Sequence, residues 1–267
     1  MHPEILSFGR FTIRAWGFFA AIAFAFGLFF SMRRAPKFGI KKDYIPDMLL
    51  VVLISSMLGS RIFYVVFHLD EFKGRWLSTI NPFGTSGSFG LAGLSMMGGV
   101  VLAIVSAYVY ARIKKIDFLT MADAVSPAFL IGAGITRIGC FFNGCCFGRP
   151  TDGLMGMMFP KHSPAGMIYK NTPIHPTQLY ASILGFAFFF IVLYFERYKR
   201  FRGYTIALVM ALYALDRFFV DLFRHYEENQ VLFRIGTAPF SVNEIIILCL
   251  FVFSTAGLIY GFIRSKR

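Results

Sequence analysis

Charged residues are scarce in this sequence, and acidic residues are scarcer than basic ones. Only 15% of the 267 residues are charged, and Asp and Glu supply 14 of them against 27 Lys and Arg. A typical soluble domain is about one quarter charged, so this shortage excludes that class. The chain has instead 57% hydrophobic residues, including 34 Phe, and a mean hydropathy of +0.63. The composition predicts a membrane protein with several spans.

The net charge of +13 would by itself suggest a nucleic-acid partner, but the positions of the basic residues exclude it. Apolar stretches long enough to cross a bilayer occur near residues 16–32, 46–68, 91–111, 119–140, 177–195, 204–223 and 240–263. More than half of the basic residues fall in every second connection, at 33–42, 112–115 and 197–202, and in the tail 264–267. Since cytoplasmic loops are rich in Lys and Arg, we predict one domain, residues 1–267, that is a bundle of seven transmembrane helices. Its N-terminus is expected outside and its C-terminus in the cytoplasm.

Two of the predicted external connections are long, at residues 69–90 and 141–176. A connection of the second length is usually a binding loop or a lid. The third apolar stretch begins with Gly98 and Gly99, which either let two helices pack closely or leave backbone groups for a ligand. The sequence leaves both interpretations open.

Several arginines lie inside or at the edge of the apolar stretches. An arginine within a span costs about 2.5–3.5 kcal/mol on insertion scales, so it is expected to face a partner or a polar cavity. Internal ion pairs with Asp216 and Asp221 are one explanation, but the arginines outnumber these two carboxylates. Guanidinium groups bind phosphate through paired hydrogen bonds, so the surplus charge predicts an anionic lipid headgroup as ligand. The arginines concerned are Arg61, Arg137, Arg217 and Arg224.

Cysteine is also rare, yet three of the four cysteines fall between Arg137 and Arg149. Their most ordinary role is as reduced, small residues in a tight loop. Either Cys145 or Cys146, beside these arginines, is alternatively a nucleophile that forms a covalent lipid intermediate. A metal site formed by Cys140, Cys145, Cys146 and His175 has suitable ligand types. The Cys-x4-Cys-Cys spacing, however, lacks the usual pairing of cysteines, so we expect no metal and no cofactor.

The order of the motifs along the whole chain resembles the prolipoprotein diacylglyceryl transferase family. The motifs are Arg14-x-Trp16-Gly17, Gly59-x-Arg61-Ile62, Met97-Gly98-Gly99, Arg137-Ile138-Gly139 with Asn143-Gly144 and Gly148-Arg149, His175-Pro176-Thr177-Gln178-Leu179-Tyr180, and Tyr213-x3-Arg217-x3-Asp221-x2-Arg224. The resemblance implies transfer of the diacylglyceryl group of phosphatidylglycerol to the lipobox cysteine of a prolipoprotein signal peptide, with release of glycerol 1-phosphate. It implies a monomer in the bacterial cytoplasmic (inner) membrane, without a cofactor and with its active site toward the outer face.

The resemblance also implies roles for individual residues. The expected catalytic residues are Arg137, Arg217, Asp221, Tyr213 and His175. The expected substrate-binding residues are Arg61, Asn143, Gly144, Gly148, Gly98, Gly99, Arg224 and Trp16.

This sequence departs from the family pattern at several of these positions. Met97 stands where histidine is common, and Trp16 stands where tyrosine is usual. In the loop, Cys140 and Cys145 replace an asparagine and a glutamate, and Asp221 replaces a glutamate. The departures leave open which group takes the proton of the acceptor thiol, and the candidates are His175, Tyr213 and Asp221. They also keep an alternative: a divergent paralogue that binds or transfers an anionic phospholipid, with a different acceptor or without catalysis.

Overall fold

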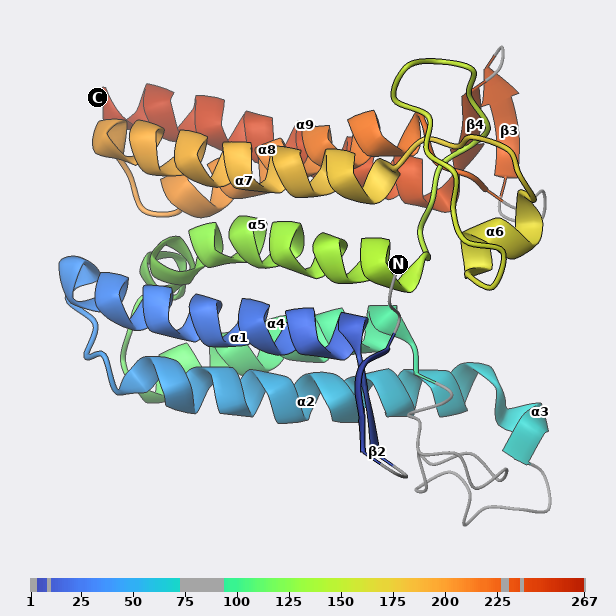
Figure 1. Ribbon diagram of the computed structural model, residues 1–267. Coiled ribbons are helices and arrows are strands. Elements are labelled where there is room, and N and C mark those ends of the chain that lie inside the picture. Colours follow the sequence, from blue (N-terminus) through green and yellow to red (C-terminus); the bar gives the residue numbers. More distant parts are fainter. Residues whose placement is uncertain (1–3, 9–10, 73–93, 227–230, 236–237, 267) are drawn as a thin grey trace. The chain divides into compact units, whose positions relative to one another are not determined.

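Most of the chain that the structure describes is helical (Figure 1). The computed structural model describes residues 4–8, 11–72, 94–226, 231–235 and 238–266. The helices are α1 (Ala15–Arg34), α2 (Tyr44–Phe67), α3 (Leu69–Phe72), α4 (Met96–Ile113), α5 (Phe118–Asn143), α6 (Pro164–Ile168), α7 (Thr177–Phe195), α8 (Tyr204–Asp221) and α9 (Val242–Ser265). Short 3-10 turns at Ala35–Phe38 and Glu196–Tyr198 follow α1 and α7.

Two short antiparallel hairpins accompany the helices. Strand β1 (Glu4–Phe8) pairs with β2 (Phe11–Arg14), and β3 (Val231–Ile235) pairs with β4 (Ala238–Ser241). Phe8 lies opposite Phe11, and Ile235 lies opposite Ala238. The hairpins were not predicted, because each strand is only four or five residues long and lies at the edge of an apolar stretch.

Each of the seven predicted apolar stretches contains a helix. Among the described residues, six helices are long and apolar enough to cross a membrane, which confirms a multi-pass membrane protein. The exception is α8, in which Asp216, Arg217 and Asp221 lower the hydropathy of the last two turns. The seventh span and the direction of the chain across the membrane therefore stay predictions. Most of segment 69–90, which the sequence predicts to be external, lies outside the described residues.

The chain forms two compact units, residues Ala35–Met121 and the remainder, Met1–Arg34 with Ala122–Arg267. In the first of these units, α2 packs against α4 through their glycines. A side chain at Gly98 would collide with the carbonyl oxygen of Gly59, and one at Gly99 would meet the side chain of Ser60. Gly98 and Gly99 therefore allow two helix backbones to approach closely, the first of the two roles that the sequence left open.

The larger unit is built around α5, which contacts both α1 and α7. Gly134 of α5 lies against Gly185 and Ser182 of α7, and the Ser182 hydroxyl donates to the Gly134 carbonyl over 2.9 Å. Gly139 of α5 lies against the start of α1, close to Trp16. A cluster of buried side chains, Leu130, Phe189, Val192 and Val209, joins α5, α7 and α8.

Charged and polar residues of this unit gather at opposite ends of its helices. We call the start of α5, the start of α8 and the ends of α1 and α7 the Asp123 end. The end of α5, the end of α8 and the start of α7 form the Arg137 end. Arg137 comes 14 positions after Asp123 in α5, which corresponds to about 20 Å along the helix axis.

Candidate active site

The segment after α5 turns sharply at the Arg137 end. Gly144 has a φ of +69° and Cys146 has a φ of +58°, which is uncommon for a residue with a side chain. The start of α7 holds this turn in place. The Thr177 hydroxyl donates to the Cys146 carbonyl over 2.8 Å, and the Gln178 amide donates to the Cys145 carbonyl over 2.7 Å. Thr177 and Gln178 are buried, so the turn is fixed from within the unit.

Three segments of the chain then cross at Gly148. Its N–H donates to the His175 carbonyl over 3.0 Å, and the Arg149 N–H donates to the Phe223 carbonyl over 2.9 Å. A side chain at Gly148 would lie 2.6 Å from both the His175 Cβ and the Phe223 carbonyl oxygen. Only glycine fits this crossing, which places Arg149, His175 and Arg224 on neighbouring segments.

The connection 141–176 is ordered by its own contacts. The Ser163 hydroxyl caps α6 by accepting from the Gly166 N–H over 3.1 Å. The Tyr169 hydroxyl lies 2.7 Å from Nδ1 of His225, whose ring stacks on Phe147. Burial raises the pKa of Tyr169, so its hydroxyl keeps its proton for this hydrogen bond. The connection is thus anchored to the residues that follow α8.

Two arginines at the end of α8 share one carboxylate. Arg217 Nη2 lies 3.0 Å from Asp221 Oδ1 and 3.1 Å from Oδ2, and Arg224 Nη1 lies 3.7 Å from Oδ1. Arg217 and Asp221 are buried, with relative exposures of 8% and 3%. Among the described residues, Arg217 Nη1 and the neighbouring Asp216 Oδ1 have no hydrogen-bond partner. Buried polar atoms almost always have partners, so this end of α8 has capacity to bind a ligand.

Arg137, on α5, lies close to the charged residues at the end of α8. Its guanidinium is close enough to interact electrostatically with Cys146, Tyr213 and Asp216. The ring of Tyr213 packs edge-on against Phe129 of α5, with 4.9 Å between centroids. The unit therefore brings Arg137, Arg217, Arg224, Tyr213 and Asp221, all predicted site residues, to the same end.

His175 lies on the crossing described above, between α7 and the residues that follow α8. Its Nδ1 is 3.1 Å from the Tyr180 hydroxyl, and its ring centroid is 5.0 Å from that of Phe223. Burial, and then the charge of Arg149, lower the pKa of His175, which favours the neutral ring. A neutral imidazole can accept a proton.

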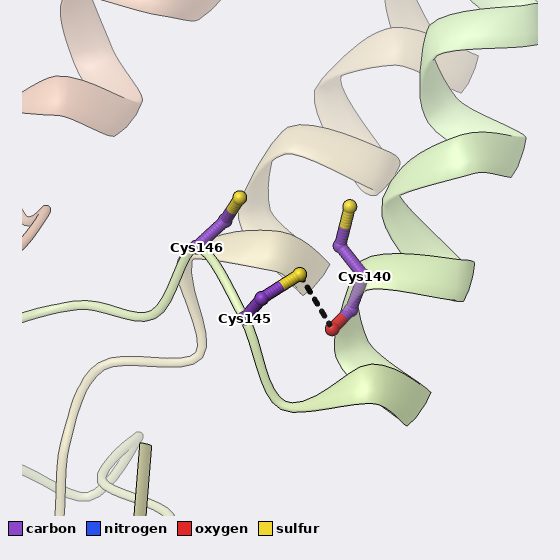
Figure 2. Close-up of side chains that lie close together, drawn as sticks. All are labelled: Cys140, Cys145 and Cys146. Atoms are coloured by element: carbon purple, nitrogen blue, oxygen red, sulfur yellow. Dashed lines mark hydrogen bonds between the residues drawn. The ribbon is translucent and has the colours of Figure 1, made fainter. Parts of the chain in front are cut away.

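The side chains of Cys140, Cys145 and Cys146 lie close together beside Arg137 (Figure 2). Their sulfur atoms are all within 4.8 Å of one another. The thiols of Cys140 and Cys145, and then the charges of Arg224 and Arg137, lower the pKa of Cys146. All four cysteines of the chain are unbridged. The spacing in the sequence disfavoured a metal site, but the turn at residues 144–146 brings three possible ligands together.

Comparison with known proteins decides the family. The family model described as prolipoprotein diacylglyceryl transferase matches residues 3–260. The chain belongs to the prolipoprotein diacylglyceryl transferase family. Among its relatives is phosphatidylglycerol–prolipoprotein diacylglyceryl transferase 1 of Clostridium perfringens, 31% identical over 83% of this chain and 82% of that protein. A Clostridium tetani relative, named phosphatidylglycerol–prolipoprotein diacylglyceryl transferase, is 29% identical over 95% of this chain and 97% of that protein.

Membership of the prolipoprotein diacylglyceryl transferase family confirms the resemblance found in the sequence and the assignment to the transferases of lipoprotein biosynthesis. It does not assign roles to single residues, which therefore rest on geometry. Asn143 and Gly144 lie at the turn after α5, and Gly148 fills the crossing. Trp16 lies at the start of α1 with its side chain more than half exposed.

Three predicted substrate-binding residues of this family member lie in the other compact unit. Gly98 and Gly99 contact α2, as described above. The guanidinium of Arg61 lies over the rings of Phe72 and Tyr64, at 5.4 and 5.9 Å from their centroids. Their part in substrate binding stays a prediction.

The structure adds polar residues to the candidate site that the sequence interpretation passed over. Glu244, in the first turn of α9, is buried and interacts electrostatically with Asp221. Gln178 has a buried Oε1 without a hydrogen-bond partner among the described residues. A glutamate in an apolar span predicts a functional position, so the sequence alone could have pointed to Glu244. The sequence named Gln178 only as part of a motif. Its burial could not be predicted, because it depends on the turn that Gln178 holds in place.

Proposed function

We propose that this chain transfers the diacylglyceryl group of phosphatidylglycerol to the cysteine thiol of a prolipoprotein, at the Arg137 end. The relatives are named for these two substrates. The observation that carries the proposal is the group of Arg137, Arg217 and Arg224, in which Arg217 is buried and its Nη1 lacks a hydrogen-bond partner among the described residues. A phosphodiester would accept hydrogen bonds from such a group and balance its charge.

The arginines are proposed to act on the leaving group. The acceptor sulfur attacks the glycerol carbon, a carbon–sulfur bond forms, and the bond from that carbon to the phosphate oxygen breaks. Glycerol 1-phosphate leaves with the additional negative charge. Guanidinium groups fixed in a poorly solvated site stabilise this charge as it develops, which is usually the largest single contribution to catalysis.

The proton of the acceptor thiol is proposed to pass to Asp216. Asp221 forms close ion pairs with Arg217 and Arg224, which makes it a poor acceptor, whereas Asp216 interacts with Arg217 and Arg137 without a close ion pair in the described part of the chain. Asp216 is buried next to Asp221 in α8, and its Oδ1 has no hydrogen-bond partner among the described residues. Tyr213 and His175 are then proposed to orient the substrates. This assignment replaces the three candidate bases of the sequence interpretation with a neighbouring carboxylate.

We further propose that α8 completes a seven-span bundle and that the Arg137 end faces the outer leaflet of the cytoplasmic membrane. The basic connections 33–42 and 197–202 adjoin the Asp123 end, and such connections favour the cytoplasm. The buried charges that lower the hydropathy of α8 are those of the proposed site. Asn143, Gly144, Gly148 and Trp16 would border the bound lipid or the acceptor peptide.

The test is an assay of the purified protein in detergent with phosphatidylglycerol and a peptide containing the lipobox cysteine. Released glycerol phosphate and the mass gained by the peptide are measured. We expect product with the native protein and a loss of at least about a hundredfold with Arg137→Ala. Arg197→Ala is the matched control, because Arg197 is an exposed arginine that stacks on Tyr194 next to the Asp123 end. Lipid binding without product would favour the lipid-binding paralogue.

A further inference from the structure

The three cysteines of the Arg137 end are not required for the chemistry proposed above. A carboxylate is a weaker base than a thiolate, whose thiol has an ordinary pKa near 8.5, so transfer of the thiol proton to Asp216 is uphill. Either the thiol becomes more acidic when it binds, or the reaction is slow. The cysteine cluster offers a way to make the thiol more acidic.

The positions of the three sulfur atoms suit a single thiophilic metal ion. They lie within 4.8 Å of one another. Sulfurs bound to one zinc ion at about 2.3 Å in tetrahedral geometry lie about 3.8 Å apart. Movement of about 1 Å, within the reach of a side-chain rotation, would bring Cys140, Cys145 and Cys146 to that separation. Figure 2 shows these side chains on the end of α5 and on the turn that follows it.

The backbone under these side chains is fixed by hydrogen bonds from N–H and O–H groups, and the Cys145 thiol also donates to the Cys140 carbonyl over 3.8 Å. The Cys145 N–H donates to the Cys140 carbonyl over 3.2 Å, and the carbonyls of Cys145 and Cys146 accept from Gln178 and Thr177. Cys146 is held at positive φ, a conformation that costs free energy and is found most often at functional sites. The sulfurs are therefore brought together by a preformed turn.

The surroundings also suit the charge of such a site. Three thiolates around one divalent ion have a net charge of −1. Arg137 and Arg224 are close enough to interact electrostatically with Cys146, and they balance this charge. Sulfur ligands select zinc or another soft ion over magnesium or calcium. Three protein ligands leave the fourth tetrahedral position open, as in zinc sites that bind a water or a substrate.

We propose that Cys140, Cys145 and Cys146 bind a zinc ion whose open position takes the acceptor thiol of the substrate as a thiolate. This inference rests on the proposed function. Coordination removes the thiol proton, which passes to Asp216 and from there to water. The zinc-bound sulfur forms the bond to the glycerol carbon, and the phosphate leaves as described. The thioether product is a weaker ligand than a thiolate and dissociates, so no electron is gained or lost by the metal.

Metal content and cobalt absorption test the site without any need for activity. The full-length protein, purified without chelators, is expected to contain about one zinc ion per chain by elemental analysis. After exchange for cobalt, we expect the charge-transfer and visible bands of a tetrahedral sulfur site. Cys140→Ser, Cys145→Ser and Cys146→Ser should each lower the metal content at least tenfold. Cys249→Ser is the matched control, because Cys249 is exposed on α9.

The acceptor peptide tests the open position in the native protein, where no variant has to fold. Adding the lipobox peptide to the cobalt form should shift the visible bands, and the same peptide with serine in place of cysteine should not. Native protein with no metal and no bands on cobalt addition would overturn the inference. Transfer activity that persists after complete removal of the metal would overturn it as well and leave the proposed function intact. Metal binding without any transfer would instead contradict the proposed function.

Discussion

The two ends of the larger unit handle buried charge in opposite ways. At the Asp123 end, Arg34 forms a two-point ion pair with Glu196, at 2.6 and 2.7 Å, and also donates to the carbonyls of Asp123 and Ala124. At the Arg137 end, Arg217 shares Asp221 with Arg224 and leaves Nη1 without a hydrogen-bond partner among the described residues. Both arginines are largely buried, so burial does not explain the difference.

At the Asp123 end, the carboxylate of Asp123 also has several hydrogen-bond and ion-pair partners. Its carboxylate has almost no exposed surface and accepts from the N–H groups of Gly203 and Ile206, over 2.8 and 2.9 Å. Lys199 adds an ion pair at 2.8 Å. These contacts tie the start of α5 to the start of α8. A buried charge with all its partners holds helices together, whereas one that lacks a partner has capacity to bind a ligand.

The largest expected effect is on catalysis, at the Arg137 end. Arg217→Ala should lower kcat/KM by about a hundredfold to a thousandfold, the range observed when one donor to a developing negative charge is removed. Arg217→Lys should recover part of the loss, because an ammonium retains the charge without the paired geometry. The transfer assay measures both. Unchanged kcat/KM in Arg217→Ala would mean that the phosphate binds elsewhere.

The corresponding change at the Asp123 end should affect stability first. Arg34→Ala leaves Glu196 without its ion pair and should cost about 3 kcal/mol. In detergent this corresponds to a fall of about 6–10 °C in the midpoint of thermal denaturation. Molecules that stay folded should keep their kcat/KM within about threefold, because the change lies about 20 Å from Arg137 along α5. A large loss of activity with no loss of stability would remove the distinction between the two ends.

A smaller effect is expected from the backbone crossing that positions Arg224. Gly148→Ala places a methyl group 2.6 Å from the Phe223 carbonyl oxygen, and this backbone atom cannot move independently. We expect a loss of about 1–3 kcal/mol in stability, together with lower activity because Arg224 is displaced. Gly257→Ala in α9 is the control, since nothing lies within 4 Å of its added methyl group. If the two variants have the same thermal midpoint, the crossing is not as tight as described.

The sequence could predict the helices because hydropathy is a property of continuous segments. All seven apolar stretches contain helices, and the order of the motifs was sufficient for the family. The arginines of the site were also predictable, because an arginine in an apolar stretch requires a partner. The sequence could not predict that Arg34 has a complete set of partners while Arg217, among the described residues, does not. Arg34 was counted among the basic residues of a connection, and only the fold shows that Glu196, at a distance of 162 residues along the chain, neutralises it.

The cysteines illustrate the opposite limit of sequence interpretation. Spacing rules for metal sites assume ligands on regular turns, and Cys-x4-Cys-Cys does not match them. Here α5 ends, Gly144 reverses the chain, and Cys146 adopts positive φ, which together bring the three sulfurs to one place. Asp216 was likewise seen as a partner for an arginine. Among the described residues its Oδ1 has no hydrogen-bond partner, because Arg217 forms its ion pair with Asp221 instead.

The smallest expected effect is on the pH dependence of the thermal midpoint, which should involve the Arg137 end and not the Asp123 end. The pKa of His175 is lowered by burial and by Arg149, so the fold favours the neutral ring. The resulting stabilisation is fully present above the unfolded pKa of about 6.5 and is lost as the pH falls below it. The thermal midpoint of the native protein should therefore fall more steeply between pH 7 and pH 5 than that of His175→Gln. None of the contacts described at the Asp123 end involves a histidine, so Arg34→Ala should keep the native slope. Parallel curves for the native protein and His175→Gln would show that His175 is equally easy to protonate in the folded and unfolded chain, and the crossing would then not exclude its charged form.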